Sequence, residues 1–210
     1  MAQIVQTDDA ISIASPPIRL AFRWDGRRWS HAIEAGGRPV AASLEWEPGR
    51  DDPAPVVSPT YQQAGCQDGP AGAQAMLVGQ WGAHHGSAVF TVADDATGVV
   101  VEVDVAVRSR AALDALSSTY TVDRSSSDLV DAGPASVVWT LDDPPGGRLR
   151  FETGGPELGT FRVGLAEAGR RLTRVQAGAD IAPGSATQRL VYRWRWLRDP
   201  RTPTGPADLE

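Results

Sequence analysis

The fold is decided by the stretch from Val99 to Arg108, which reads VVVEVDVAVR. Its odd-numbered positions from 99 to 107 are all valine, whereas the charged residues Glu102, Asp104 and Arg108 stand at even-numbered positions. Successive side chains of a β-strand point to opposite faces of the sheet. The alternation therefore predicts a strand with one face buried in a core and the other in contact with water.

Residues 188–197 repeat this alternation, with apolar side chains on one face and arginines on the other. The apolar members are Leu190, Tyr192, Trp194 and Trp196, and the cationic members are Arg189, Arg193 and Arg195. Neighbouring cations on one face repel each other unless carboxylates of the next strand pair with them. We expect Glu102 and Asp104 to pair in this way, and capture of an acidic ligand is the alternative.

A hairpin is predicted at residues 18–33. Ile18, Leu20, Phe22 and Trp24 alternate with other residues before the turn dipeptide Asp25-Gly26. After that turn, Trp29, His31 and Ile33 share one face of the returning strand. His31 is therefore expected to be a hydrogen-bonded histidine of the core.

Weaker strand patterns occupy most of the remaining sequence, separated by turns rich in Gly, Pro and Asp. They lie at 11–14, 39–46, 74–81, 87–93, 118–123, 136–141, 148–153, 159–166 and 171–177. Only Arg110 to Leu116 has a helical pattern, and it is about two turns long. We therefore expect an all-β protein, a large antiparallel two-sheet β-sandwich of about a dozen strands with at most one short helix.

Three segments lack this regularity. Residues 49–72 are rich in Pro and Gly and are expected to form a long loop, or to contain an edge strand near Val56-Val57. Residues 124–134 are expected to form a second long loop. Residues 198–210 are expected to be a disordered tail that ends in Leu209-Glu210, which resembles a cloning scar. The sandwich is thus predicted to be one domain spanning residues 1–197.

Composition excludes several function classes. The net charge of −6 disfavours nucleic acid and anionic membrane surfaces, which bind basic proteins. No apolar stretch approaches the roughly 20 residues that span a bilayer, and residues 1–15 do not have the pattern of a signal peptide. The single Cys66 rules out an internal disulfide. We expect a cytoplasmic protein that is soluble, and the absence of Lys and Asn suggests a GC-rich genome.

The seven tryptophans allow two interpretations. Exposed aromatic rings form platforms for sugars in many β-sandwiches, whereas buried rings fill the space between sheets. Trp24, Trp194 and Trp196 share their faces with aliphatic residues, which favours core packing. Trp81 ends a predicted strand and opens the turn Gly82–Gly86, where its ring can face solvent. It is the preferred candidate for a ligand platform.

His84 and His85 are the candidate acid–base groups, because they follow Trp81 in the same turn. The competing interpretation is a pair of partly exposed turn histidines without a chemical role. Zinc requires three or four ligands, and no spacing of His and Cys supplies them, so no metal and no cofactor is expected. Asp94-Asp95 and Asp142-Asp143 are interpreted as turn residues.

Two stretches resemble the carbohydrate-handling β-sandwiches typified by galactose mutarotase, the supersandwich domains. One is Ile181-Ala182-Pro183-Gly184 leading into the final strand at Arg189–Trp194, and the other runs from Trp81 through Val107. The resemblance implies a saccharide as ligand. The catalytic His and Glu of that family have no counterparts in this sequence that can be matched, so no catalytic role is carried over.

Three hypotheses about function follow. The first is a carbohydrate-binding or carbohydrate-associated domain without catalytic activity, in which Trp81, His84 and His85 bind the ligand. The second is a sugar-active enzyme of the mutarotase or isomerase type, which requires a histidine close to a carboxylate. The third is a structural or protein-interaction domain that uses an exposed sheet edge. The most useful structural observation is whether the 49–72 segment and the 82–86 turn converge on one concave pocket.

Overall fold

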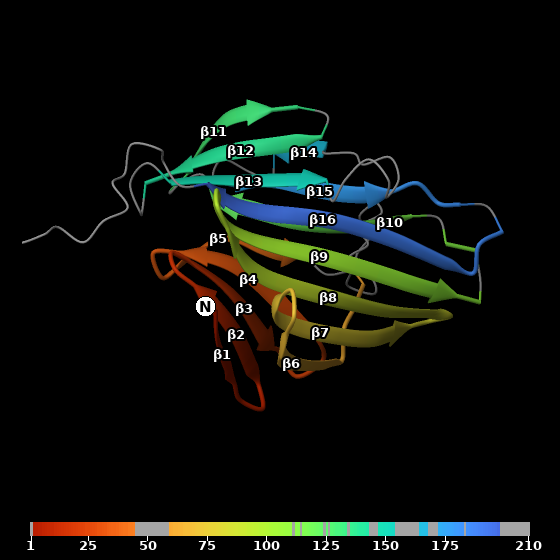
Figure 1. Cartoon of the computed structure of the whole chain (residues 1–210). Coiled ribbons are helices and arrows are strands. Elements are labelled where there is room, and N and C mark those ends of the chain that lie inside the picture. The colour runs from red at the N-terminus through yellow and green to blue at the C-terminus, as the bar shows by residue number, and fades with distance from the viewer. Residues whose placement is uncertain are drawn as a thin grey trace, which may run out of the picture.

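The chain folds into two antiparallel β-sheets that face each other (Figure 1). The structure, a computed structural model, describes residues 2–44, 59–110, 112–113, 115–123, 125, 127–133, 135–142, 147–153, 164–167, 172–182 and 184–197. Within these residues there are sixteen strands and no helix. The prediction of an all-β two-sheet sandwich is therefore confirmed, with more strands than the dozen expected. Nowhere in the described ranges is there a helix long and apolar enough to cross a bilayer.

The first sheet contains eight strands in the order β1-β2-β3-β4-β5-β10-β15-β14. Their bounds are β1 Gln3–Gln6, β2 Ala10–Ser15, β3 Ile18–Trp24, β4 Trp29–Ala35, β5 Arg38–Leu44, β10 Leu116–Asp123, β15 Leu172–Ala179 and β14 Gly164–Glu167. The predicted hairpin is the β3–β4 pair, in which Trp24 lies opposite Trp29.

The second sheet also contains eight strands, in the order β11-β12-β13-β16-β9-β8-β7-β6. Their bounds are β11 Ser127–Ala132, β12 Ser136–Leu141, β13 Gly147–Thr153, β16 Thr187–Leu197, β9 Gly98–Ser109, β8 His84–Asp95, β7 Gly72–Trp81 and β6 Gln63–Gly69. The last of the described strands, β16, inserts between β9 and β13 and pairs with both.

The inner faces of the two sheets form one apolar core. Every odd-numbered valine from Val99 to Val107 is at most 1% exposed, and Trp194 of β16 is equally buried. Trp196 is buried as predicted, and Trp24 is half-buried against the same core. The alternation in the sequence therefore assigned the inner faces of β9 and β16 correctly.

The outer face of the second sheet carries the predicted ion pairs. Arg193 lies directly opposite Glu102, and its Nε donates to a Glu102 carboxylate oxygen at 2.8 Å. Arg189 reaches diagonally to Asp104 with two hydrogen bonds of 2.6 and 2.7 Å. Arg195 donates to Glu152 of β13 at 3.2 Å. Cross-strand carboxylates therefore neutralise the arginines of β16, as expected.

Three predictions of local structure are wrong. Arg110–Leu116 is not a helix in its described part: the Arg110 amide bonds to the Ala83 carbonyl, and Leu116 begins β10. The 49–72 and 124–134 segments contain β6 and β11. Both are edge strands that pair on one side only, so nearly all of their side chains are exposed or half-buried and the alternation is weak. The Val56-Val57 alternative and the tail at 198–210 lie outside the described residues.

A chain of hydrogen bonds crosses the centre of the core. His31 of β4 lies with its Nε2 2.7 Å from the Tyr120 hydroxyl of β10. That hydroxyl lies 2.6 Å from the hydroxyl of Tyr192 on β16, in the opposite sheet. All three side chains are buried, which confirms the expectation for His31. The chain gives the two sheets a specific polar contact inside an otherwise apolar interior.

Burial lowers the pKa of His31 to about 3. The rings of Phe22 and Phe90 lie beside the imidazole, at centroid distances of 5.7 and 4.7 Å. The unfolded chain, with a histidine pKa near 6.5, binds a proton that the folded chain rejects between about pH 6.5 and pH 3. The contribution of the neutral His31 to the stability of the fold is therefore fully present above pH 6.5 and is lost as the pH falls from 6.5 to about 3.

We expect this histidine to lower the free energy of unfolding by about 2 kcal/mol between pH 7 and pH 5. Urea unfolding at a series of pH values measures the dependence. The His31→Gln variant, which has no titrating group at this position, is the control and should show a flatter profile in the same range. Equal slopes for the two proteins would contradict the assignment to His31.

A short segment connects the two sheets at one end of the sandwich. The Trp29 amide of β4 donates to the Tyr61 carbonyl at 2.8 Å, and the Gln62 amide donates to the Val78 carbonyl of β7 at 3.0 Å. The segment passes so close to Gly79 that a Cβ there would lie 2.0 Å from the Thr60 carbonyl oxygen. Glycine at position 79 therefore permits this connection.

Replacing Gly79 with Ala should destabilise the fold by about 1–3 kcal/mol, because the added methyl group forces the Thr60 backbone away. The midpoint of urea unfolding measures the loss. Gly65→Ala is the matched control: Gly65 lies on the neighbouring strand β6, and its Cβ would meet no atom within 4 Å. A smaller effect for Gly79→Ala than for Gly65→Ala would refute the steric role.

Candidate functional site

The predicted site residues lie at one end of the β7–β8 hairpin. Trp81 is the last residue of β7, and His84 and His85 are the first two of β8. Only Gly82 and Ala83 connect the strands, with Gly82 at a φ of +56°. The histidines are thus strand residues rather than turn residues, which corrects the expectation. Because neighbouring strand residues point to opposite faces, the sheet separates His84 from His85.

Trp81 packs on the inner side of the sheet. It lies opposite His84 in the β7–β8 pairing, and the two ring centroids are 5.6 Å apart. The indole also covers Gly86, where a Cβ would lie 2.6 Å from the Trp81 ring atom Cζ3. Trp81 is half-buried and in contact with the core cluster. These contacts give the ring a packing role.

The Trp81→Ala variant should therefore lose about 1–3 kcal/mol of stability, less than a fully buried tryptophan would. Trp81→Phe keeps an aromatic ring over Gly86 and should recover more than half of that loss. Chemical denaturation of the three proteins measures the difference. An Ala variant as stable as the wild type would show that the ring contributes no packing and would favour the platform interpretation.

His84 lies on the same inner side as Trp81 and has a hydroxyl partner. Its Nδ1 is 2.8 Å from the Ser109 hydroxyl of β9, the residue directly opposite in the β8–β9 pairing. A hydroxyl becomes an activated nucleophile when an adjacent imidazole acts as its base and a third group orients that imidazole. Among the described residues no carboxylate lies within 4 Å of either His84 or His85.

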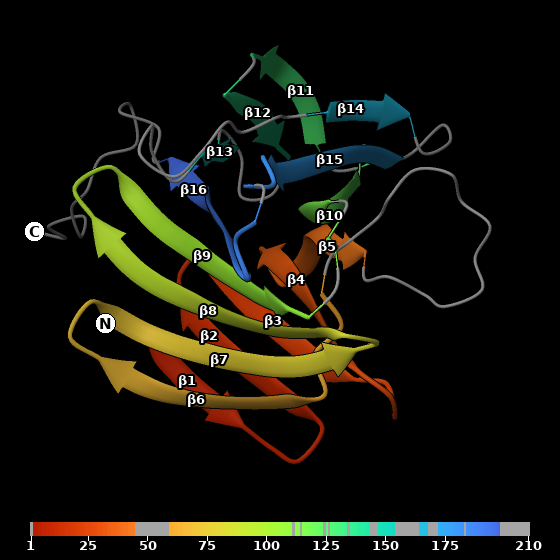
Figure 2. The same cartoon turned by 90° about the vertical axis from the view of Figure 1, so that its right-hand side faces the viewer.

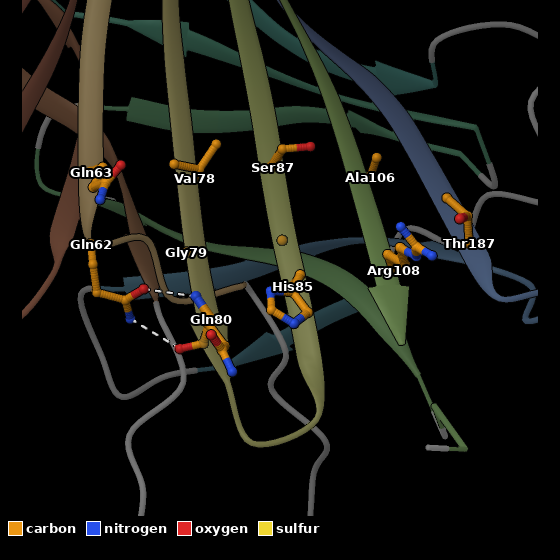
Figure 3. Close-up of a pocket in the computed structure, with 11 residues that line it drawn as sticks. Gln62, Gln63, Val78, Gly79, Gln80, His85, Ser87, Ala106, Arg108 and Thr187 are labelled. Carbon is orange, nitrogen blue, oxygen red and sulfur yellow. Dashed lines mark hydrogen bonds between the residues drawn. The ribbon is translucent and has the colours of Figure 1, made fainter. Parts of the chain in front are cut away.

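His85 is exposed on the outer face, where it lines a groove of about 580 Å³ (Figure 3). The groove crosses β6, β7, β8, β9 and the start of β16. Its polar lining consists of Gln62, Gln63, Gln80, His85, Ser87, Arg108 and Thr187. The 49–72 segment and the β7–β8 turn region thus both contribute to this groove.

Strand register explains the hollow. Ser87 lies opposite Val78 on one side and Ala106 on the other, so three short side chains form one row across β7, β8 and β9. In the next row, the long side chains of Gln80, His85 and Arg108 stand in register in the same way. Small side chains therefore make the floor of the groove, and large polar ones make its wall.

Gln62 fixes the edge of the groove next to β6. Its side-chain Oε1 accepts a hydrogen bond of 2.7 Å from the backbone N–H of Gln80, and its Nε2 donates to the backbone carbonyl of Gln80 at 3.3 Å (Figure 3). The side-chain amide thus takes the place of a backbone residue and extends the β6–β7 pairing past Gln63 and Val78. The backbone of Gln80 is held at the edge of the groove as a result.

The groove has the chemistry of a polar binding site. Amides, hydroxyls, one imidazole and one guanidinium surround it, and no Asp or Glu is among the described residues that line it. Asp95 of the same strand is too distant to take part, because it lies ten residues from His85, a rise of about 33 Å. Hydrogen bonds, the strongest from the Thr97 hydroxyl, lower the pKa of Asp95 to about 2. No group of three potential metal ligands occurs in the described part of the chain.

Sequence reasoning identified His85 and missed most of its neighbours. Gln62, Gln80, Arg108 and Thr187 become adjacent only through the pairing of β6, β7, β8, β9 and β16. Their residue types carry no motif, and the register of the strands is the signal that assembles them. No protein-family model matches the sequence, and a search of curated proteins finds no match.

Proposed function

We propose that this protein is a saccharide-binding domain without catalytic activity, and that the ligand occupies the groove around His85. The observation that carries the proposal is the lining of the groove. Hydroxyl-rich ligands require many donors and acceptors at a concave surface, and seven polar side chains converge there over a floor of small residues. The resemblance to carbohydrate-handling β-sandwiches supports the same ligand class.

The absence of a carboxylate from the described lining favours binding over catalysis. An isomerase or mutarotase mechanism needs a general acid and a general base on the two sides of the reacting sugar. His85 has Arg108 directly opposite, and His84 lies on the other side of the sheet beside Ser109. The two histidines therefore do not act on one substrate in this arrangement, and the enzyme hypothesis takes second place.

The third hypothesis, protein interaction through a sheet edge, has one specific observation in its favour. The edge strand β11 exposes Leu129 and Val130, which are 43% and 56% accessible. Unpaired backbone groups beside apolar side chains are suited to pairing with a strand of a partner. A charge on this edge, as in Val130→Lys, should leave saccharide binding unchanged, so the two functions are separable.

A glycan array followed by titration calorimetry tests the proposal. Ser87→Trp fills the floor of the groove from the outer face and should weaken binding by at least about tenfold without loss of stability. Thr91→Trp is the matched control, because Thr91 lies on the outer face of the same strand and outside the groove. Binding that is absent from the whole array, or equal in the two variants, would overturn the proposal.

A further inference from the structure

We infer that the groove selects a saccharide with a single carboxylate, a uronic-acid sugar, and that Arg108 and His85 bind that carboxylate. The inference rests on the proposed saccharide function and specifies the ligand class. It starts from the charges on the outer face of the second sheet.

The arginines of β16 on this face are neutralised by the protein itself. Arg193 bonds to Glu102, Arg189 to Asp104, and Arg195 to Glu152. Arg108 of β9 is exposed on the same face, and no carboxylate of the described residues lies within 4 Å of its guanidinium. A cation that has no acidic partner among the described residues of the outer face thus lines the groove.

The neighbours of Arg108 place further hydrogen-bonding groups beside its charge. His85 is its direct partner in the β8–β9 pairing, so the Cβ atoms of the two residues are about 5 Å apart. Thr187 is its partner on the other side, in the β9–β16 pairing. Figure 3 shows the side chains of His85, Arg108 and Thr187 side by side along this row. A planar guanidinium with an N–H donor on one side and a hydroxyl on the other matches a carboxylate.

The remaining groups of the groove fit the rest of a sugar acid. The side chains of Gln63 and Gln80 and the hydroxyl of Ser87 offer donors and acceptors to ring hydroxyls beside the carboxylate position. The net charge of −6 repels ligands with many negative charges, so a single charge is favoured over a polyanion. The ligand class is therefore a saccharide with one acidic residue.

The experiment compares disaccharides that carry one glucuronate, galacturonate or mannuronate residue with their methyl esters. Esterification removes the charge and keeps the sugar ring. By calorimetry the wild type should bind at least one acid about tenfold or more tightly than its ester, because hydrogen bonds to charged groups are the stronger ones. Arg108→Gln should abolish that preference, because the affinity for the acid should fall to that for the ester.

Arg148→Gln is the matched control, since Arg148 is exposed on the outer face of β13 and outside the groove. It should keep the preference of the wild type. Equal affinity for acid and ester, or an equal loss in the two arginine variants, would overturn the inference. The carboxylate assignment would be overturned if a disaccharide without a uronate, but with one sulfate group at O6, bound more tightly than every uronate.

The two proposals fail in different ways. If only neutral sugars bind, and Ser87→Trp removes their binding, the saccharide function stands and the acidic ligand is refuted. If neither the array nor the uronate panel yields a ligand, the saccharide function itself is refuted, and the acidic ligand with it.

Discussion

The burial of one face of each sheet against the other is the constraint on which the rest of this structure depends. Neither sheet has helices to cover it in the described residues, so each inner face is shielded from water by the opposite sheet (Figure 2). The chain strengthens this contact by crossing repeatedly between the sheets. Strands β1–β5 complete one edge of the first sheet and β6–β9 that of the second, and later strands extend both in turn.

Polar contacts give this apolar interface a defined geometry. The hydrogen bonds from His31 through Tyr120 to Tyr192 join three strands from both sheets. They form because each of these polar groups loses its hydrogen bonds to water on burial and needs a partner in the protein. At the side where β1 and β6 form neighbouring edges, the Cys66 thiol donates to the Gln6 side-chain oxygen at 2.7 Å. At the end near Gly79, the Tyr61 segment bonds to strands of both sheets.

The outer face of the second sheet is free of these packing demands, and this explains why the groove forms there. Along β9 and β16 the outer positions hold ion pairs that cover the surface with long side chains. At the groove, the outer positions Val78 of β7, Ser87 of β8 and Ala106 of β9 hold short side chains. The inward-facing Trp81 and His84 contribute to the end of the core, and the groove proposed to bind the ligand lies on the opposite face of the same hairpin.

The amino-acid sequence by itself determined the strand class, the inner faces of β9 and β16, the β3–β4 hairpin and the ion pairs of Arg189 and Arg193. The strand class, the inner faces and the hairpin follow from the two-residue period of a strand and from its turn, which are local properties. The ion pairs were expected because the charges on the outer faces of the two strands are complementary. The alternation did not predict the edge strands β6 and β11, because a strand that pairs on one side only and buries neither face fully needs no alternation of apolar and polar residues. Tertiary structure alone decided that His84 and His85 face opposite ways and that Arg108 stands opposite His85. Register between strands depends on long-range pairing, which a single sequence does not encode at any one position.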